Sequence, residues 1–148
     1  MNLIRFKDVP VSYAQDWFLL RLKHHQPYQL LWKKVPASFS EESAFWSQKL
    51  ASSLKHKPAY FPQEGSEFQQ QVWRAIAQIP WGELRTYSEL AQAIGSPRAV
   101  RAVAGACGKN PLPLFIPCHR VVGKADLGGF NGGVEFKKKL LRLEGHSC

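Results

Sequence analysis

The segment TYSELAQAIGSPRAVRAVAGACGK, residues 86–109, constrains the fold most, because it encodes two helices separated by a very short turn. Thr86 begins a capping box, in which two side chains satisfy free backbone N–H groups at the start of a helix. Gly95 is typical of a helix end, and Ser96 and Pro97 are typical of the cap and first residue of the next helix. Two helices joined so tightly predict a helix-turn-helix.

The second of these helices is built mainly from small residues, with Arg98 and Arg101 as its long side chains. A helix with a small face can approach either DNA or another helix closely, so the small residues alone leave both readings open. The charge balance favours DNA, because 20 Lys and Arg against 11 Asp and Glu give a net charge of +9. The small residues are Ala99, Ala102, Ala104, Gly105 and Ala106.

The segment KPAYFPQEGS, residues 57–66, separates two regions of different character. Two prolines and a glycine this close together resist regular structure, so we expect a domain boundary here. We predict a small α/β N-terminal domain over 1–60 and a mostly α-helical, DNA-binding and catalytic domain over 61–148. The 148 residues are enough to bury a core without disulfides or structural metals.

In the N-terminal region, strands are expected over 2–6 and 28–35, and 12–24 fits either a helix or a strand followed by a turn. A helix is expected over 40–57, since Ser40 can cap it, glutamates follow the cap and lysines come at the end. Together these elements predict a small sheet with one helix.

In the C-terminal region, the helix-turn-helix is expected to be preceded by a helix that starts at Ser66 and stops at Pro80. The prolines before Cys118 predict an extended run that continues through the valines after it, and the glycines of 123–133 predict a mobile loop. The pattern VEFKKKLLRLEG predicts a last helix that ends at Gly145, with the apolar residues Phe136, Leu140 and Leu143.

Cys118 and His119 stand side by side in IPCHR and suggest a reactive thiol. A thiol is a poor nucleophile until a base or a positive field lowers its pKa. His119 could be that base, directly or through a water molecule, and Glu144 is a carboxylate that the chain could bring back to orient the imidazole. The alternative is a buried structural thiol, since free cysteine is among the most buried residue types.

Several other classes of protein are not supported by the sequence. No apolar run approaches the ~20 residues that a membrane span needs, and the start lacks the apolar stretch of a signal peptide. We therefore expect a cytoplasmic monomer, or a nuclear one in a eukaryote, without a membrane partner. The three cysteines form no CxxC pair and the glycines lack GxxxxGK spacing, so neither a structural zinc nor a nucleotide is expected. Ordinary surface or core roles, not metal binding, are expected for His24, His25 and His56.

The stretch NPLPLFIPCHRVV, residues 110–122, is preceded by YSELAQAIGSPRAVRAVAGACGK and followed by GGFNGG and LLRLEG. Together these motifs resemble the O6-alkylguanine-DNA alkyltransferases, also called methylated-DNA–protein-cysteine methyltransferases. The resemblance runs from about Phe68 to Gly145. It implies a winged-helix-like helix-turn-helix in the C-terminal domain and a ribonuclease-H-like N-terminal domain, although the first sixty residues match only in size and α/β character.

The activity implied by the resemblance is DNA repair by direct reversal of damage. A protein of this family binds double-stranded DNA that carries alkylated bases, rotates the damaged guanine out of the stack, and transfers the O6-alkyl group irreversibly to a cysteine. Alkylated thymine is a further substrate in this class of reaction. Each molecule acts once, and the chemistry needs no cofactor and no metal.

The resemblance also implies roles for catalytic residues. Cys118 would accept the alkyl group, and His119 would be its water-mediated base, oriented by Glu144. Asn110 would hold the cysteine loop in place, and Tyr87 would crowd the phosphate beside the flipped base and contact its ring.

Further roles follow from the resemblance for the DNA interface and the pocket. Arg101 would fill the gap in the stack, on a DNA-contacting surface that also includes Ser96, Arg98, Ala99, Ala102 and Gly105. Val121 would read the exocyclic amine of guanine through its backbone. Phe130 would form the pocket wall with the backbone N–H of Asn131, and Lys137 would lie near the active site, while the rest of the KKK run would be a solvated helix face. Cys107 is expected as a small residue on the DNA-facing helix.

Two competing functions stay open at this point. A non-catalytic sensor of alkylated bases would bind the lesion without reacting, but such relatives replace the cysteine that this chain keeps at 118. A thiol hydrolase is the other, although adjacent Cys and His is not the arrangement of the common cysteine proteases.

Overall fold

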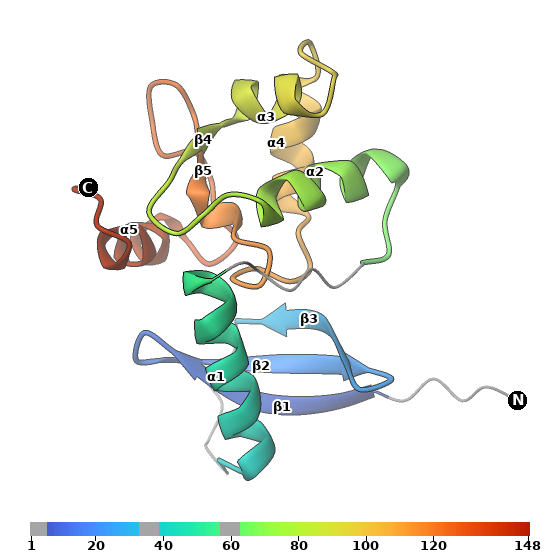
Figure 1. Ribbon diagram of the computed structural model, residues 1–148, viewed down its shortest axis with the longest axis vertical. Coiled ribbons are helices and arrows are strands. Elements are labelled where there is room, and N and C mark those ends of the chain that lie inside the picture. Colours follow the sequence, from blue (N-terminus) through green and yellow to red (C-terminus); the bar gives the residue numbers. More distant parts are fainter. Residues whose placement is uncertain (1–5, 33–38, 57–62) are drawn as a thin grey trace, which may run out of the picture.

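The computed structural model describes residues 6–32, 39–56 and 63–148. Figure 1 shows two parts, a sheet crossed by helix α1 (Glu41–Lys55) and a larger, mostly helical part that carries the C-terminus. Both parts agree with the two-domain arrangement expected from the sequence. No helix in the described parts of the chain combines the length and the hydrophobicity that a bilayer span requires.

The N-terminal sheet is an antiparallel meander of β1 (Phe6–Tyr13), β2 (Asp16–Lys23) and β3 (Gln26–Leu31). The segment 12–24 is therefore strand and turn, and the helix considered for it is wrong. Of the strand predicted over 2–6, only the last residue lies in the described part, where it begins β1. Both connections are two-residue turns with positive φ at both positions, as type I′ hairpins require; the turn residues are Ala14, Gln15, His24 and His25.

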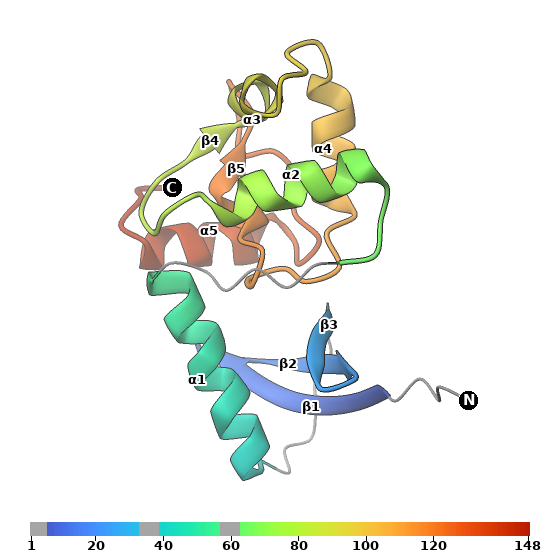
Figure 2. The ribbon, with the colours of Figure 1, turned by 45° about the vertical axis from the view of Figure 1, so that its right-hand side comes forward.

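Helix α1 (Glu41–Lys55) lies across one face of the sheet, as Figures 1 and 2 both show. Ser40 caps it as predicted, because its side chain accepts a hydrogen bond from the Ser43 backbone N–H at 3.1 Å. Alternate residues of the strands face the helix and are removed from water, which is the main source of stability for a unit of this size. The buried apolar residues of this layer are Val9, Val11, Phe18, Leu20, Leu22, Leu30, Trp46, Leu50 and Leu54.

Three helices pack together in the C-terminal part: α2 (Glu67–Ala77), α3 (Tyr87–Ala93) and α4 (Val100–Gly108). Capping boxes begin α2 at Ser66 and α3 at Thr86. The sequence predicted a helix start at Ser66 and the capping box at Thr86. The start of α4 differs from the prediction. Pro97 and Arg98 form a turn, and the Ala99 N–H donates to the Ser96 carbonyl at 2.9 Å. The helix begins at Val100, three residues after Pro97, without a side-chain cap.

The chain around the cysteine is more compact than the extended run predicted from its prolines. Leu114 has a φ of 74°, which turns the chain, and Cys118–Arg120 form a single turn of 3-10 helix closed by the bond from Arg120 N–H to the Pro117 carbonyl. The two valines that follow form β5 (Val121–Val122), parallel to β4 (Arg85–Thr86) just before α3. The cysteine is therefore fixed between the start of the helix-turn-helix and the last helix.

The last helix is α5 (Val134–Leu143), and Glu144 is its C-terminal cap. Its buried face differs from the predicted stripe, because Leu143 is 50% exposed and Lys137 is fully buried. Lys138 and Lys139 are partly exposed, so Lys137 is the buried residue of the three consecutive lysines. Hydrogen bonds join this C-terminal part to the sheet, including Leu30 N–H to the Pro111 carbonyl and Lys139 to Asp16.

Candidate alkyl-acceptor site

Cys118 lies at a cavity of about 270 Å³ between α4 and the glycine-rich loop. This size is close to the lower end of the ~300–1,000 Å³ range of small-molecule pockets, and it suits a single ring system. Only 6% of the cysteine is exposed, so a reactant reaches the sulfur only by entering the cavity. The lining residues are Tyr87, Ala104, Cys107, Gly108, Cys118, Gly129, Phe130 and Asn131.

His119, the residue that follows the cysteine, forms a buried pair with Glu144. His119 Nε2 lies 2.6 Å from Glu144 Oε2, and both side chains are at most 1% exposed. The other ring nitrogen, Nδ1, is buried and has no hydrogen-bond partner within the described residues. A carboxylate on one side fixes the proton on Nε2 and leaves the lone pair of Nδ1 free, which is the arrangement of a general base.

Arg120 is a residue of this site that was not predicted from the sequence. It is fully buried, and it donates to both oxygens of Glu144, from Nε at 2.7 Å and from Nη2 at 3.3 Å. It also donates to two backbone carbonyls, Ile79 in the C-terminal part and Leu54 at the end of α1, each at 2.7 Å. Its place beside the Cys-His pair was a visible signal, but nothing in the sequence predicts that an arginine is buried there.

These contacts determine the charge state of the pair. Burial alone would raise the pKa of Glu144, but the hydrogen bonds from His119 and Arg120 outweigh it and hold that pKa below its usual value. Burial lowers the pKa of His119, although the carboxylate partly offsets this effect. The resting pair at neutral pH is therefore a carboxylate and a neutral imidazole, and the imidazole can accept a proton.

The resting thiol is protonated. Burial raises the pKa of Cys118 to about 11, while a hydrogen bond from Asn110 and the charge of Lys137 act in the opposite direction. The Asn110 side chain also closes the loop, because it donates to the Ile116 carbonyl at 2.8 Å and accepts from the Leu112 N–H at 2.9 Å. A protonated thiol needs a nearby base to react, and this makes the unpartnered nitrogen of His119 chemically significant.

Lys137 is a buried cation whose charge lowers the pKa of the Cys118 thiol. Its ammonium donates to three backbone carbonyls, those of Val121 at 2.7 Å, Gly129 at 3.2 Å and Leu127. The lysine therefore ties the strand after the cysteine to the loop that forms the pocket wall. Burial lowers the pKa of Lys137, and its interaction with the two buried cysteines raises it.

We expect Lys137→Met to make Cys118 less reactive, because the variant keeps the length of the side chain and removes the positive charge that lowers the thiol pKa. The pH dependence of alkylation of the Cys118 peptide by iodoacetamide measures this effect. The profile should move to higher pH, and alkylation at a fixed pH should fall roughly tenfold for each unit of pKa. Lys138→Met is the matched control, because Lys138 is the next lysine of the same helix and is partly exposed. Identical profiles for the two variants would contradict this role.

Tyr87 begins α3 and lines the cavity. It packs closely on Gly128, where a Cβ atom would lie 2.4 Å from the phenol oxygen and where φ is +70°. Both facts require glycine at that position. Burial raises the pKa of Tyr87, so the hydroxyl stays protonated and can donate a hydrogen bond into the cavity.

Phe130 and Asn131 reach the cavity from the glycine-rich loop. The side chain of Asn131 donates to the Gly108 carbonyl at 2.7 Å, which joins the loop to the end of α4. Val121 is buried and does not line the cavity, and its carbonyl accepts from Lys137. The sequence reading missed Ala104, Gly108 and Gly129 as lining residues.

Cys107 lies on α4, on the side of the helix that faces the protein interior. It is buried, it faces the same cavity as Cys118, and burial raises its pKa to about 12. The expected DNA-contacting residues lie on the other side of α4 and on the turn before it. Arg98, Arg101, Ala102 and Gly105 are exposed, and Ser96 and Ala99 are half-buried.

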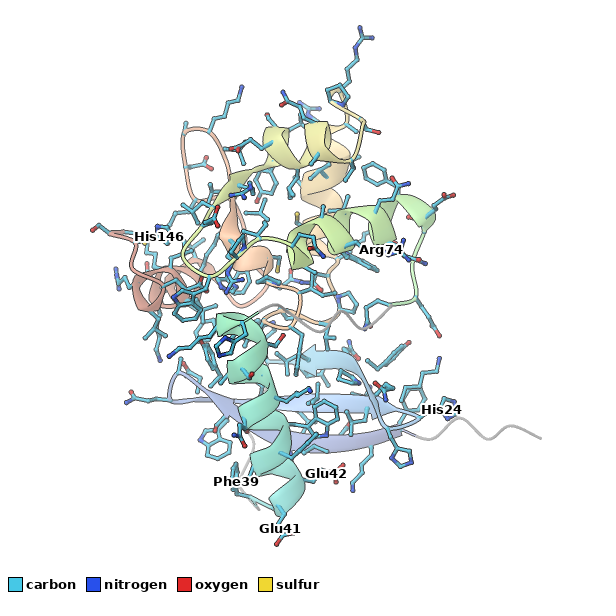
Figure 3. All side chains as sticks on the ribbon, in the orientation of Figure 1. His24, Phe39, Glu41, Glu42, Arg74 and His146 are labelled. Carbon is cyan, nitrogen blue, oxygen red and sulfur yellow. The ribbon has the colours of Figure 1, made fainter. Side chains whose placement is uncertain are left out.

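The histidines outside this site do not converge on a common point. Figure 3 shows His24 at a hairpin on the edge of the N-terminal sheet and His146 on the other part, near the C-terminus. Within the ranges that the structure describes, no three His, Cys, Asp or Glu side chains are grouped to hold a metal ion.

A helix-turn-helix beside a cavity with a cysteine and a buried histidine–carboxylate pair defines a DNA-modifying thiol protein. Residues 67–146 match the family described as "6-O-methylguanine DNA methyltransferase, DNA binding domain". The chain is 56% identical to the methylated-DNA–protein-cysteine methyltransferase of Haemophilus influenzae over 136 residues, which are 90% of this chain and 73% of that protein. The chain therefore belongs to the methylated-DNA–protein-cysteine methyltransferase family.

Other relatives agree with this assignment. A probable methylated-DNA–protein-cysteine methyltransferase of Acanthamoeba polyphaga mimivirus is 57% identical over 81 residues, 55% of this chain and about half (54%) of that protein. Among solved structures, Mycobacterium tuberculosis OGT in complex with DNA superposes with a TM-score of 0.75 at 30% identity, over 93% of this chain and 91% of that one. The match to that structure includes the N-terminal sheet as well as the helical part.

Proposed function

We propose that this protein repairs O6-alkylguanine in duplex DNA by moving the alkyl group irreversibly to Cys118. It is a methylated-DNA–protein-cysteine S-methyltransferase that acts once. The observation that supports this most directly is the position of Cys118 at a cavity of about 270 Å³, beside a buried His119–Glu144 pair whose free nitrogen can take the thiol proton.

Transfer begins with removal of a proton from the thiol. His119 Nδ1 accepts this proton, directly or through a water molecule, and Glu144 stabilises the imidazolium that forms. Asn110 and Lys137 stabilise the thiolate, because both lower the pKa of Cys118. Burial alone would leave the sulfur protonated, and the His119–Glu144 pair provides the base that removes this proton.

The thiolate then attacks the alkyl carbon of the lesion. A sulfur–carbon bond forms while the carbon–O6 bond breaks, and the electron pair of that bond goes to the guanine. The guanine takes up one proton and becomes an ordinary base, so one proton is lost from the thiol and one is gained by the product. Tyr87 lines the cavity, and in this proposal its hydroxyl donates a hydrogen bond as this charge develops.

The reaction ends with a thioether on Cys118. A thioether has no proton for His119 to remove and no good leaving group, so the acceptor is not regenerated. Restored guanine and spent protein are therefore formed one for one.

The base must leave the helix to reach this cavity, since an alkyl carbon on a stacked guanine is inaccessible. We infer that α3 and α4 act as a winged-helix-like helix-turn-helix, with the small, exposed face of α4 in the minor groove. A Cβ on Gly105 would touch nothing within 4 Å in the protein, which leaves that face open to DNA. Arg101 is exposed there and would take the place of the flipped base.

We expect Arg101→Ala to slow repair of duplex DNA roughly ten- to hundredfold, because the lost stacking of the flipped base is no longer offset, at about 1–3 kcal/mol. Transfer from free O6-methylguanine should stay unchanged, since a free base needs no extrusion. Single-turnover rates with the two substrates measure this difference. Arg142→Ala, at an exposed arginine of α5, is the control and should change neither rate. Equal losses on both substrates would exclude the proposed role of Arg101.

The finer features of the N-terminal part stay proposals. We infer that its sheet and helix are a ribonuclease-H-like unit that ends before a boundary within 57–66. A monomer is expected, because the site is complete within one chain. A cytoplasmic location, or a nuclear one in a eukaryote, follows from the proposed DNA substrate.

Loss of O6-methylguanine from a duplex tests repair against lesion sensing. The protein should convert the lesion to guanine, in an amount equal to the protein added, as measured by chromatography of the hydrolysed DNA. Binding of the lesion duplex without any loss of O6-methylguanine would favour the sensor instead. Continued turnover of an ester or peptide would favour a thiol hydrolase.

A further inference from the structure

Phe130, the aromatic wall of the cavity, belongs to a loop that its own sequence does not hold rigid. Glycines flank it at 128–129 and 132–133, and two of these four have positive φ. Such a backbone has little conformational preference of its own. The position of the wall must therefore come from packing against other parts of the protein.

Trp32, which follows β3 of the N-terminal sheet, provides that packing. Its ring centroid is 5.5 Å from that of Phe130 at 75° and 5.1 Å from that of Phe136 at 74°, which are edge-to-face contacts. Phe18 of β2 also contacts the indole edge-to-face, with ring centroids 5.0 Å apart. A Cβ on Gly132 would lie 2.9 Å from the indole, so the loop backbone is also pressed against it.

The indole does not itself line the cavity. It lies behind Phe130, and Phe130 in turn lies 6.4 Å from the ring of His119. An aromatic chain thus runs from the N-terminal sheet to the wall of the pocket and to the catalytic base. This contact is independent of the hydrogen bond between Arg120 and the end of α1.

Building on the proposed function, we propose that Trp32 is a specificity-determining positioning residue, through which the N-terminal sheet sets the size of alkyl group that the pocket accepts. The indole prevents Phe130 from retreating. A fixed wall holds a methylated guanine with its small alkyl carbon against the sulfur, and it leaves little room for a bulky alkyl group. The substrate class concerned is O6-alkylguanine, with methyl favoured over benzyl.

Removal of the indole should change the preference rather than only the rate. In Trp32→Ala, Phe130 gains space behind it, so the base is held less closely. Methyl transfer should then fall roughly tenfold, because misplacement of the reacting atoms by about 1 Å can lower the rate up to a hundredfold. Benzyl transfer should fall less or rise, because the wider pocket admits the ring. The ratio of benzyl to methyl transfer should therefore rise at least about fivefold.

The experiment compares single-turnover rates with duplexes that carry O6-methylguanine or O6-benzylguanine. Trp17→Ala is a matched control, because Trp17 is a tryptophan of the same sheet that packs on Phe39 and not on the loop. It should leave the ratio unchanged. Trp32→Phe keeps an aromatic ring and should give an intermediate ratio, which decides the question if the alanine variant does not fold.

The outcomes separate this inference from the function on which it rests. If the unmodified protein transfers neither group, the proposed function fails. If it transfers methyl normally but neither Trp32 variant alters the ratio, the function stands and the role of Trp32 is wrong. An equal loss of rate on both substrates would likewise contradict the inference, because it would mean that Trp32 has only a structural role.

Discussion

Cys118→Ala is expected to transfer no alkyl group at all and to bind lesion-containing duplex as the unmodified protein does. The sulfur is the atom that forms the new bond, so no other side chain can replace it in the reaction. Cys107 faces the same cavity, but burial raises its pKa to about 12 and the His119–Glu144 pair adjoins Cys118. Only 6% of Cys118 is exposed, so its side chain contributes little to the surface that docks on DNA.

Two measurements check this expectation: the loss of O6-methylguanine from the duplex and the dissociation constant of the same duplex. Cys148→Ala is the matched control, because Cys148 is an exposed cysteine away from the cavity, and it should keep full activity. Residual transfer by the Cys118 variant would mean that another residue is the acceptor. Weakened DNA binding would mean that the thiol has a structural role.

Glu144→Gln is expected to slow transfer roughly 10²- to 10⁴-fold at neutral pH. A glutamine amide can donate to Nε2 and so favour the tautomer with a proton on Nδ1, which cannot act as the base. It also removes the carboxylate that stabilises the imidazolium. The pKa of His119, already lowered by burial, should fall further, because the carboxylate is the group that raises it.

The pH dependence distinguishes this explanation from simple unfolding. Rates for the variant should recover as the pH rises from about 7 to about 10, because the thiolate then forms without a base as its pKa near 11 is approached. The unmodified protein should show no such rise. A variant that stays slow at all pH values, with an unchanged fold, would contradict the role of the pair.

Glu144→Gln should also lower stability, by about 3 kcal/mol, because Arg120 loses a buried anionic partner. The folded-state pKa of Glu144 lies below its ordinary value, so its contribution to stability is present above the pKa of the unfolded chain and is lost as the pH falls. Thermal unfolding at several pH values separates this effect from the effect on transfer.

Local patterns in the sequence predicted much of the fold. The capping boxes at Ser66 and Thr86 place two helices correctly, because their hydrogen bonds lie within four residues. The two hairpins of the N-terminal sheet were ambiguous, because their turns use Ala-Gln and His-His where Asn-Gly or Asp-Gly would be the usual signal. The Ser96-Pro97 pair forms a turn where a helix start was predicted, since a serine and a proline favour both.

The candidate site was predictable where its residues share a recognisable motif. The adjacency of Cys118 and His119 suggested a reactive thiol, and the resemblance pointed to Glu144. The burial of Arg120 and Lys137 was not predictable, because both depend on carbonyl groups supplied by distant segments. The packing of Trp32 behind the pocket wall likewise depends on the tertiary structure and leaves no local pattern.

The mass of the protein after incubation with excess O6-methylguanine duplex shows whether Cys118 is the alkyl acceptor. We expect the addition of one methyl group per chain, located by peptide mapping on the peptide that contains Cys118, with no further addition at longer times. An unmodified Cys118 peptide from protein that has bound the duplex, or a methyl group on a different residue, would contradict it.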